Sequence, residues 1–432
     1  MPAAAFFITF LVCIVGGFAR TPLLGFGAYI LVFYGHPPSR WWGALLPDLR
    51  WSFTAAICAV LAAYFYKPVS YVSNKPWHQD TIIRWVVIFI AWMWMQTPWV
   101  LGLDAHLEGV IIMTKYLLVM YVLVKILDSP QAMDFMFVAH IVGCAYLGVL
   151  ARDMSVSGER LDGVGGPGID DANTLGMMFA TGAVLSAVQL LAGPLWKRGL
   201  VLLCTPFILN GLVLTQSRGA FLGLATGGFA LFFLAPKGKR KVIGSMGAAG
   251  AVLFLVLASQ TFWERMQTIQ VEEGQEREKS AESRLVIAAS QLRMFADHPM
   301  GVGHRGTAAL SREYIPEEYL AKEAGVSEEN RQRSSHNTFL TVLVEQGVIG
   351  AVIYFSLLVT VFRRLFVLRS LPGATEEQKR ISMLAAGVGG ALVAVLISGQ
   401  FADYLRAEVL AWLYAMVVAM SRMMTTVRAH AK

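Results

Sequence analysis

The sequence predicts an all-α, polytopic membrane protein with about twelve transmembrane helices and an external subdomain of amphipathic helices. Hydrophobic residues make up 56% of the chain and charged residues only 15%, whereas soluble domains carry about 25% charged residues. Apolar runs approach the length of about 20 residues that a membrane span requires and recur along almost the whole chain. One long segment, residues 261–335, interrupts them.

Thirteen apolar segments are candidates for membrane spans, and several of them are short. If the first two both cross the membrane, the N-terminus lies outside; if they form one span and a re-entrant piece, it lies inside and the total is twelve. We favour twelve. The segments are 3–19, 21–35, 51–66, 82–101, 109–127, 132–151, 172–192, 196–215, 218–235, 241–260, 337–362, 381–401 and 406–421.

The basic residues predict which side of the membrane each loop faces. Lysine and arginine concentrate in 193–198, 236–241, 363–380 and the C-terminus, and short basic loops beside spans mark the cytoplasmic side. Segments 152–171 and 261–335 are then external. The net charge of +7 follows from this topology, so the lipid bilayer is the expected partner and nucleic acid is not.

Residues 261–335 hold 23 of the 65 charged residues, with both signs mixed. Within them Leu285, Ala288, Leu292 and Phe295 recur at helical spacing, which predicts an amphipathic helix. A second short helix is expected from Pro316 to Gly325. The chain therefore divides into an N-terminal transmembrane bundle (1–260), a large external loop (261–335), and C-terminal transmembrane helices with a tail (336–432).

Four side chains stand out by position, because all are expected at the external surface, where the positive-inside bias disfavours arginine. They are Arg218, Arg265, Arg284 and His336. Each arginine also has a structural interpretation as an interfacial anchor or ion-pair partner. His336 has one too, as an interfacial polar residue.

Helix capping accounts for other polar residues near the expected span ends. Ser334 or Ser335 would cap the helix after His336. Asp170, Asp171 and Asn173 could bind a metal, but capping of the seventh span is the favoured interpretation. The chain has no Asp-x-Asp, and its four cysteines lie in apolar runs without metal-ligand spacing. No metal and no cofactor is therefore expected.

Several local strings occur in a fixed order around the long external segment. This series resembles the bacterial O-antigen ligase and O-antigen polymerase superfamily over roughly residues 170–360. A looser likeness, in Gly17-Phe-Ala-Arg-Thr-Pro22 through Pro47-Asp-Leu-Arg-Trp51, is to exosortase-associated O-glycosylation ligases. The strings of the main resemblance are Thr215-Gln-Ser-Arg-Gly-Ala220, Glu282-Ser-Arg-Leu285, Ala296-Asp-His-Pro-Met-Gly-Val-Gly303, Ser335-His-Asn-Thr-Phe-Leu340 and Glu345-Gln-Gly-Val-Ile-Gly350.

The resemblance implies a glycosyltransferase of the bacterial inner membrane that acts on the periplasmic side. The implied donor is a glycan on undecaprenyl diphosphate, and the acceptor of the ligases is a sugar of the lipid A–core. By motif, the functional arginines of the family fall on Arg218 and Arg284 and its histidine on His336, while Arg265 matches a looser pattern.

The residue types suit that chemistry independently. Cleavage of a sugar–diphosphate bond develops charge on phosphate oxygens, and arginine offers them a planar, permanently charged fork. Several arginines could replace a divalent metal as the electrophilic clamp. A sugar hydroxyl attacks poorly unaided, so His336 would serve as the base. A single in-line attack would invert the anomeric configuration.

Three alternatives remain on sequence grounds. An O-antigen polymerase or a protein O-oligosaccharyltransferase would use the same donor with another acceptor. A lipid-linked glycan flippase or transporter would belong to a different class, and transporters tend to show repeat symmetry and polar sites at mid-membrane. Because no repeat is visible and the candidate residues gather on one face, the enzyme is favoured.

Overall fold

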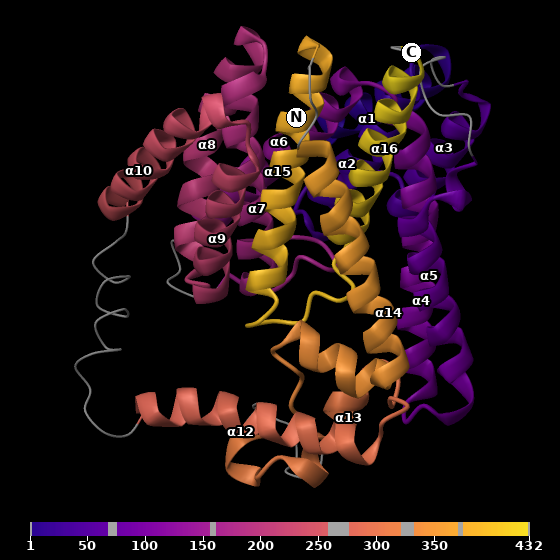
Figure 1. The fold of residues 1–432 in the computed structure, drawn as a ribbon, viewed down its shortest axis with the longest axis vertical. Coiled ribbons are helices and arrows are strands. Elements are labelled where there is room, and N and C mark those ends of the chain that lie inside the picture. The colour runs from indigo at the N-terminus through magenta and orange to yellow at the C-terminus, as the bar shows by residue number, and fades with distance from the viewer. Residues whose placement is uncertain are drawn as a thin grey trace.

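The computed structural model describes residues 2–67, 76–155, 161–257, 276–320, 332–369 and 375–430, and every regular element within them is helical (Figure 1). Six short 3-10 helices accompany the α-helices: Pro37–Ser39, Gly43–Leu45, Trp77–Gln79, Thr97–Trp99, Lys237–Lys239 and Glu317–Tyr319. The α-helices are α1 (Pro2–Ala19), α2 (Pro22–Gly35), α3 (Trp51–Phe65), α4 (Thr81–Gln96), α5 (Leu103–Ile126), α6 (Pro130–Ser155), α7 (Ala172–Ala192), α8 (Leu195–Thr215), α9 (Arg218–Leu234), α10 (Arg240–Leu257), α12 (Glu276–Asp297), α13 (Gly306–Tyr314), α14 (Thr338–Arg369), α15 (Glu376–Ser398) and α16 (Glu408–His430).

The all-helical polytopic class is confirmed, and each of the thirteen predicted apolar segments corresponds to one helix of the bundle. Within the described residues, seven helices are long and apolar enough to cross a membrane: α1, α5, α6, α7, α8, α14 and α15. The remaining apolar helices are shorter or more polar, so the number of crossings stays a prediction. The expected boundaries differ mainly at α14 and α16, which continue to Arg369 and His430.

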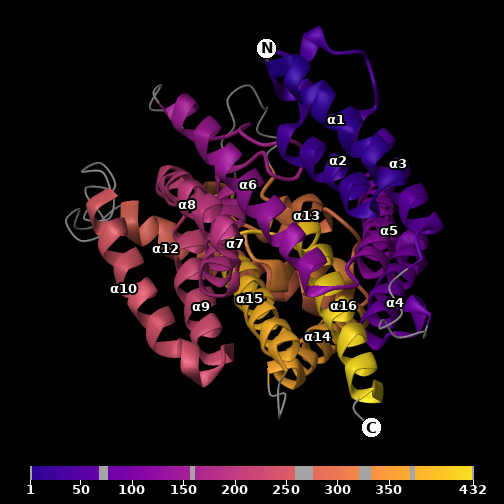
Figure 2. The same ribbon diagram turned by 90° about the horizontal axis from the view of Figure 1, so that it is seen from above.

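The bundle has two chemically different ends. The basic end comprises residues 193–198, 235–241, 363–369 and 375–380; the loop end comprises residues 97–102, 161–171, 216–217, 298–305, 332–337 and 399–407, together with α12 and α13. Figure 1 shows α12 running across the direction of the bundle helices at the loop end. Seen from above, α7, α15 and α16 lie centrally, whereas α10 and the α1–α3 group lie at opposite edges (Figure 2).

Glycines let α9 pack closely against α15. A Cβ on Gly227 would lie 2.7 Å from the carbonyl oxygen of Gly390, and one on Gly390 would lie 2.8 Å from that of Gly227. Small residues of this kind let two membrane helices approach closely. One consequence is that the first turn of α9 lies beside the loop that joins α15 to α16, where the Ser398 hydroxyl donates to the Gly219 carbonyl at 3.1 Å.

Helix α14 is two helices joined at a kink. The glycines at this kink belong to two of the strings quoted from the sequence, the one that ends at Gly303 and the one that begins at Glu345. Gly347 has φ 65° and ψ −172°, so a short helix, 338–346, precedes the long part of α14. The segment after α12 inserts at this point: the amide of Val302 donates to Val344 at 3.1 Å and that of Gly303 to Glu345 at 2.9 Å. Gly301 and Gly303 have φ of +81° and +83°, conformations that favour glycine.

The external segment contains the predicted amphipathic helix, and the residues that it buries against the protein differ in part from the predicted apolar series. Leu285 and Leu292 are 73% and 52% exposed, whereas Ile287 and Met294 are 5% and 0% exposed. Hydrophobic spacing identified the helix and not which of its two faces packs on the protein. Of the expected helix from Pro316 to Gly325, a 3-10 turn begins after Pro316 and the part beyond residue 320 lies outside the described residues. Helix α13 was not predicted.

Candidate functional site at the loop end

Arg218 is the first residue of α9 and follows a tight turn. Gln216 adopts the left-handed conformation, with φ 52°, and ends α8. The Ser217 hydroxyl then accepts from the amide of Ala220 and caps α9, as serine commonly does. Arg218 is exposed, and no described residue forms an ion pair or hydrogen bond with its guanidinium. The turn thus presents an unpaired cation at a helix N-terminus, a favourable location for anions.

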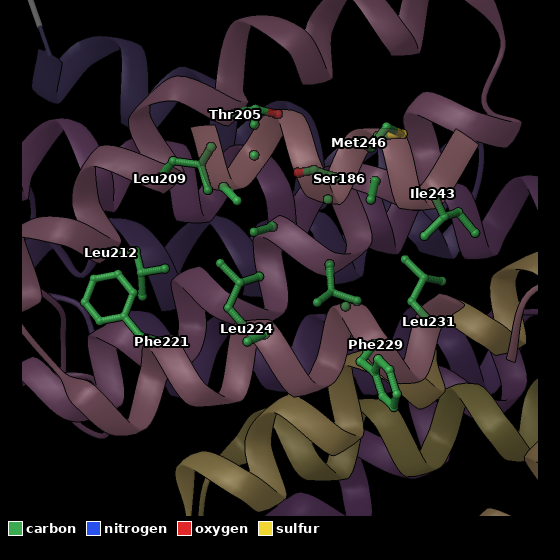
Figure 3. A pocket seen from close by; sticks show the side chains of 18 of the residues that line it. Ser186, Thr205, Leu209, Leu212, Phe221, Leu224, Phe229, Leu231, Ile243 and Met246 are labelled. Atoms are coloured by element: carbon green, nitrogen blue, oxygen red, sulfur yellow. The ribbon is translucent and has the colours of Figure 1, made fainter. Parts of the chain in front are cut away.

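A large apolar cavity lies among α7, α8, α9 and α10, and Arg218 lines it together with Gln216. Its volume is about 1060 Å³. Figure 3 shows leucine and phenylalanine side chains of α8 and α9 along it, with Ser186 of α7, Thr205 of α8, and Ile243 and Met246 of α10 among them. The Ser186 and Thr205 hydroxyls both donate to carbonyls of their own helices, which removes most of their polarity. The wall of the cavity is therefore apolar, whereas Gln216 and Arg218 line it at the turn between α8 and α9.

His336 is exposed and lies two residues before α14, as predicted. The expected cap by Ser334 or Ser335 is wrong: the Asn337 side chain accepts from the amides of Phe339 and Leu340 at 2.9 and 3.1 Å. The Ser335 hydroxyl donates to the Asn337 carbonyl instead, at 3.0 Å. Asn337 can do this because its side-chain oxygen reaches the first turn from directly before it.

The other two predicted arginines are less fully described. Arg265 lies outside the described residues. Arg284 lies inside α12, which begins at Glu276. It precedes Gln291 by two helical turns, about 10 Å along the axis. The Gln291 side chain donates to the Ser335 hydroxyl at 2.8 Å, so α12 contacts the residue next to His336.

The loop formed by residues 399–407 joins the segments that carry Arg218 and His336. On one side, Gly219 makes room for Phe401, since a Cβ on the glycine would lie 2.9 Å from that of Phe401. On the other side, the Asn337 side chain donates to the Gln400 side chain at 3.1 Å. The Arg218 turn, α12 and the His336 segment therefore meet at one end of the molecule through shared neighbours.

The same loop supplies Arg406 to a partly buried polar cluster, which we call the Arg406 cluster. Its members are Arg406, Asp403, Glu345 and His304. The Arg406 guanidinium lies 3.6 Å from the Glu345 carboxylate and 3.3 Å from the Asp403 carboxylate. It also donates to Nδ1 of His304, which lies 3.4 Å from the same Glu345 oxygen. Glu345 is only 4% exposed, so its charge depends on these partners.

Hydrogen bonds define the protonation of both histidines near this cluster. Nδ1 of His106 accepts from the backbone amide of His304 at 3.1 Å, so its Nε2 carries the proton and donates to the Met93 carbonyl at 2.9 Å. Nδ1 of His304 accepts from Arg406, which requires a neutral ring. Burial, reinforced by the Arg406 charge, lowers the pKa of His304 to about 3. The close approach of His304 to Glu345 is therefore a contact with a neutral ring.

Burial raises the pKa of the Asp403 carboxyl, and Arg406 opposes that shift. The guanidinium of Arg406 thus contacts two acidic side chains, those of Glu345 and Asp403. Arg406 is the ion-pair partner of Glu345 in this cluster.

Helix capping is the observed role of Asp171. Its side chain accepts from the amides of Asn173 and Thr174 at 2.8 and 3.2 Å, which satisfies donors at the start of α7. The Asn173 side chain in turn accepts from the Ser217 hydroxyl at 3.0 Å, next to Arg218. In the described ranges, no group of three or more His, Cys, Asp or Glu side chains is placed to hold a metal ion.

Fold and site together define a multi-pass helical membrane protein with a polar, arginine-containing site at one end of the bundle. Residues 200–355 match the family model described as O-antigen ligase. This match confirms the predicted resemblance and supports membership of the O-antigen ligase superfamily, with glycan transfer of the ligase or polymerase type. A search of curated proteins found no match.

The matched region spans all four predicted site residues and also His304 and Glu345, but it ends before Arg406. Sequence reasoning missed His304 and Arg406. For His304 the available signal was its position directly after the string that ends at Gly303. For Arg406 it was an arginine, close to Asp403, in a short loop expected on the external side. Neither signal indicates the partner, because the contacts join residues far apart in the chain.

Proposed function

We propose that the chain transfers a glycan from undecaprenyl diphosphate to a sugar of the lipid A–core, at the periplasmic face of the bacterial inner membrane. The observation that carries the proposal is the apolar cavity with Arg218 and Gln216 at its lining. A donor of this kind is a long apolar chain with an anionic head, and the cavity pairs an apolar wall with the exposed cation of Arg218. The family match supports the same reaction class.

In this proposal the arginines bind the diphosphate and His336 takes the proton of the acceptor hydroxyl. Arg218 stands at the start of α9, where the helix dipole also favours negative charge. Arg284 and Arg265 would complete the clamp from the external segment. His336 is exposed before a helix N-terminus, which favours its neutral, proton-accepting form. Transfer would be metal-independent and would invert the anomeric centre, because one attack breaks the sugar–phosphate bond.

The test is transfer by purified protein supplied with a lipid-linked glycan and each acceptor in turn: lipid A–core, a second lipid-linked glycan, and an acceptor protein. We expect product on lipid A–core, at an unchanged rate in excess EDTA and with inverted anomeric configuration by NMR. Product on one of the other acceptors would assign a polymerase or a protein O-oligosaccharyltransferase instead. Rescue by Mg²⁺ or Mn²⁺ after loss in EDTA would contradict the arginine clamp.

The same preparation in sealed vesicles separates the enzyme from a transporter. A flippase would move the lipid-linked glycan between leaflets and leave the diphosphate linkage intact. We expect undecaprenyl diphosphate to be released only when an acceptor is present. Movement of donor without any release would replace the transferase by the transporter.

A further inference from the structure

The loop formed by residues 399–407 holds the short helix 338–346 at both of its ends. At the beginning, the amide of Thr338 donates to the Gly399 carbonyl at 2.7 Å, and its hydroxyl donates to the Ala402 carbonyl at 2.9 Å. That hydroxyl also accepts from the amide of Tyr404 at 2.8 Å. Near the end of the helix, Arg406 contacts Glu345 at 3.6 Å. One loop therefore contacts the helix that follows His336 at both of its ends.

Within the described residues, this loop, the external segment and α4 all contact the polar end of that helix. From α4, the Gln96 side chain donates to the Glu345 carbonyl at 3.1 Å and the Trp92 side chain donates to the Gln346 carbonyl at 2.8 Å. From the external segment, Val302 and Gly303 donate to the carbonyls of Val344 and Glu345. The Arg406 cluster connects the 399–407 loop with the external segment, since the guanidinium contacts Glu345 of the helix and His304 of the external segment. His106 fixes the backbone of His304 from α5.

We propose that Arg406 is a positioning residue for the proposed transfer reaction, which acts through Glu345 and His304 to hold the His336 segment against the loop that contacts the Arg218 turn. This inference rests on the proposed function. Arg406 touches none of the groups assigned to donor or acceptor. Its three partners come from α14, the external segment and its own loop, so its loss would remove one contact from each of them.

The reason that a single arginine suits this place is geometric. A guanidinium has five N–H donors in a fixed plane, so it can address Glu345 and His304 through one nitrogen and Asp403 through the other. A lysine ammonium would keep the charge but not this fork. The conservative variant Arg406→Lys should therefore restore part of what Arg406→Ala removes.

The chain offers a closely matched control at its basic end. Arg380 contacts Asp134 there, with side-chain exposures of 22% and 3%; the corresponding exposures for Arg406 and Glu345 are 20% and 5%. Both arginines thus serve a buried carboxylate with the same access to solvent. Arg380→Ala removes a comparably buried arginine contact, leaves Lys197 beside Asp134 at 3.2 Å, and touches nothing at the loop end.

The experiment measures kcat and donor affinity for full-length Arg406→Ala, Arg406→Lys and Arg380→Ala in detergent or nanodiscs, with hydrogen exchange of the amides of 338–346. We expect Arg406→Ala to lower kcat by about 10- to 100-fold, the size of effect that a misplacement of about 1 Å produces, with donor affinity retained and exchange of 338–346 accelerated. Arg406→Lys should recover part of the rate. Arg380→Ala should leave exchange in 338–346 and kcat per folded molecule unchanged.

Wild-type kcat in folded Arg406→Ala would overturn the inference, and so would a loss of donor affinity like that of Arg218→Ala, since Arg406 would then be a donor ligand. If Arg406→Ala fails to insert, Glu345→Gln keeps the shape, removes the charge and must give the same pattern. Absence of transfer by the wild type with every acceptor would contradict the proposed function only. The exchange comparison still tests Arg406, because unchanged exchange would overturn its positioning role.

Discussion

The two ends of the bundle use the same residue types in opposite proportions. At the basic end, the Asp134 carboxylate accepts from Lys197 at 3.2 Å, from Gln189 at 2.9 Å and from Arg380. At the loop end, one arginine, Arg406, lies between the carboxylates of Glu345 and Asp403. The first site has two cations for one carboxylate, and the second has two carboxylates for one cation.

This difference separates a structural clamp from a site that joins loops. The Asp134 partners come from α7, α8 and α15, so the basic residues that predict topology also tie four helices together. A buried carboxylate with full partners is costly to disturb and offers nothing to a ligand. At the loop end the connected elements are loops and a short helix, and the exposed Arg218 lies at the same end. The end with two cations for one carboxylate thus holds helices together, whereas the end with two carboxylates for one cation connects loops.

The sharpest test of the comparison is whether the two ends face opposite sides of the membrane. Single cysteines at Glu318, exposed in the external segment, and at Lys239, exposed between α9 and α10, should respond oppositely to an impermeant maleimide in a background without the four native cysteines. We expect Glu318→Cys to be labelled in cells whose inner membrane is intact. Lys239→Cys should be labelled only after permeabilisation.

A reversed pattern would invert the topology and move the proposed site to the cytoplasm. The control is Lys239→Cys and Glu318→Cys in detergent, where both should be labelled to completion.

The next largest effect should come from the residues assigned to chemistry. His336→Ala should lower kcat by roughly 10²–10⁴-fold, as expected for loss of a general base, with donor binding retained. Arg218→Ala should weaken donor binding and transfer together, because the diphosphate carries charge before and during bond cleavage. Single-turnover transfer and donor binding in membrane-inserted variants distinguish the two patterns.

Arg198→Ala is a suitable control for the arginine, since Arg198 lies at the basic end and, within the described residues, its guanidinium donates only to the Gly193 carbonyl. Unimpaired transfer by His336→Ala would remove the base from the mechanism. Retained donor affinity in Arg218→Ala would remove the arginine from the diphosphate site.

The sequence predicted the helices well because apolar length is the dominant constraint in a membrane. All thirteen apolar runs became helices, and the turn at Arg218 and the start of α14 after His336 were expected. The buried face of α12 was not, because Leu285 and Ile287 are both apolar and periodicity alone does not show which one meets the protein. The kink at Gly347 was also missed, since it depends on the packing of Gly301 against it.

The Arg406 cluster could not be predicted for a different reason. Its members His304, Glu345 and Arg406 belong to three segments that are brought together only by the kink in α14 and the insertion of residues 299–303. Local spacing carries no information about such contacts. Asn337 shows the same limit at short range: serine and asparagine are both good caps, and only the backbone geometry selects between them.

The smallest predicted effect concerns the pH dependence of stability at the loop end. The pKa of His304 is about 3 in the folded chain, whereas an unfolded histidine has a pKa of about 6.5. Below pH 6.5 the unfolded state therefore takes up a proton that the folded state excludes, so stability falls as the pH is lowered from 6.5 toward 3. By pH 5 the loss should approach about 2 kcal/mol. Thermal unfolding in detergent at pH 7.5, 6 and 5 measures it.

His304→Gln should lower the melting temperature at pH 7.5, because it loses the ring contacts, but should flatten the further decrease between pH 7.5 and 5. Arg406, Glu345 and Asp403 face the same ring, and the two carboxylates titrate in both proteins, so the difference between variant and wild type isolates the histidine. His298→Gln, in the same string but partly exposed, should keep the wild-type slope. If His304→Gln loses as much stability on acidification as the wild type, His304 is not the buried neutral group that the Arg406 contact requires, and the contrast between the two ends would rest on the carboxylates alone.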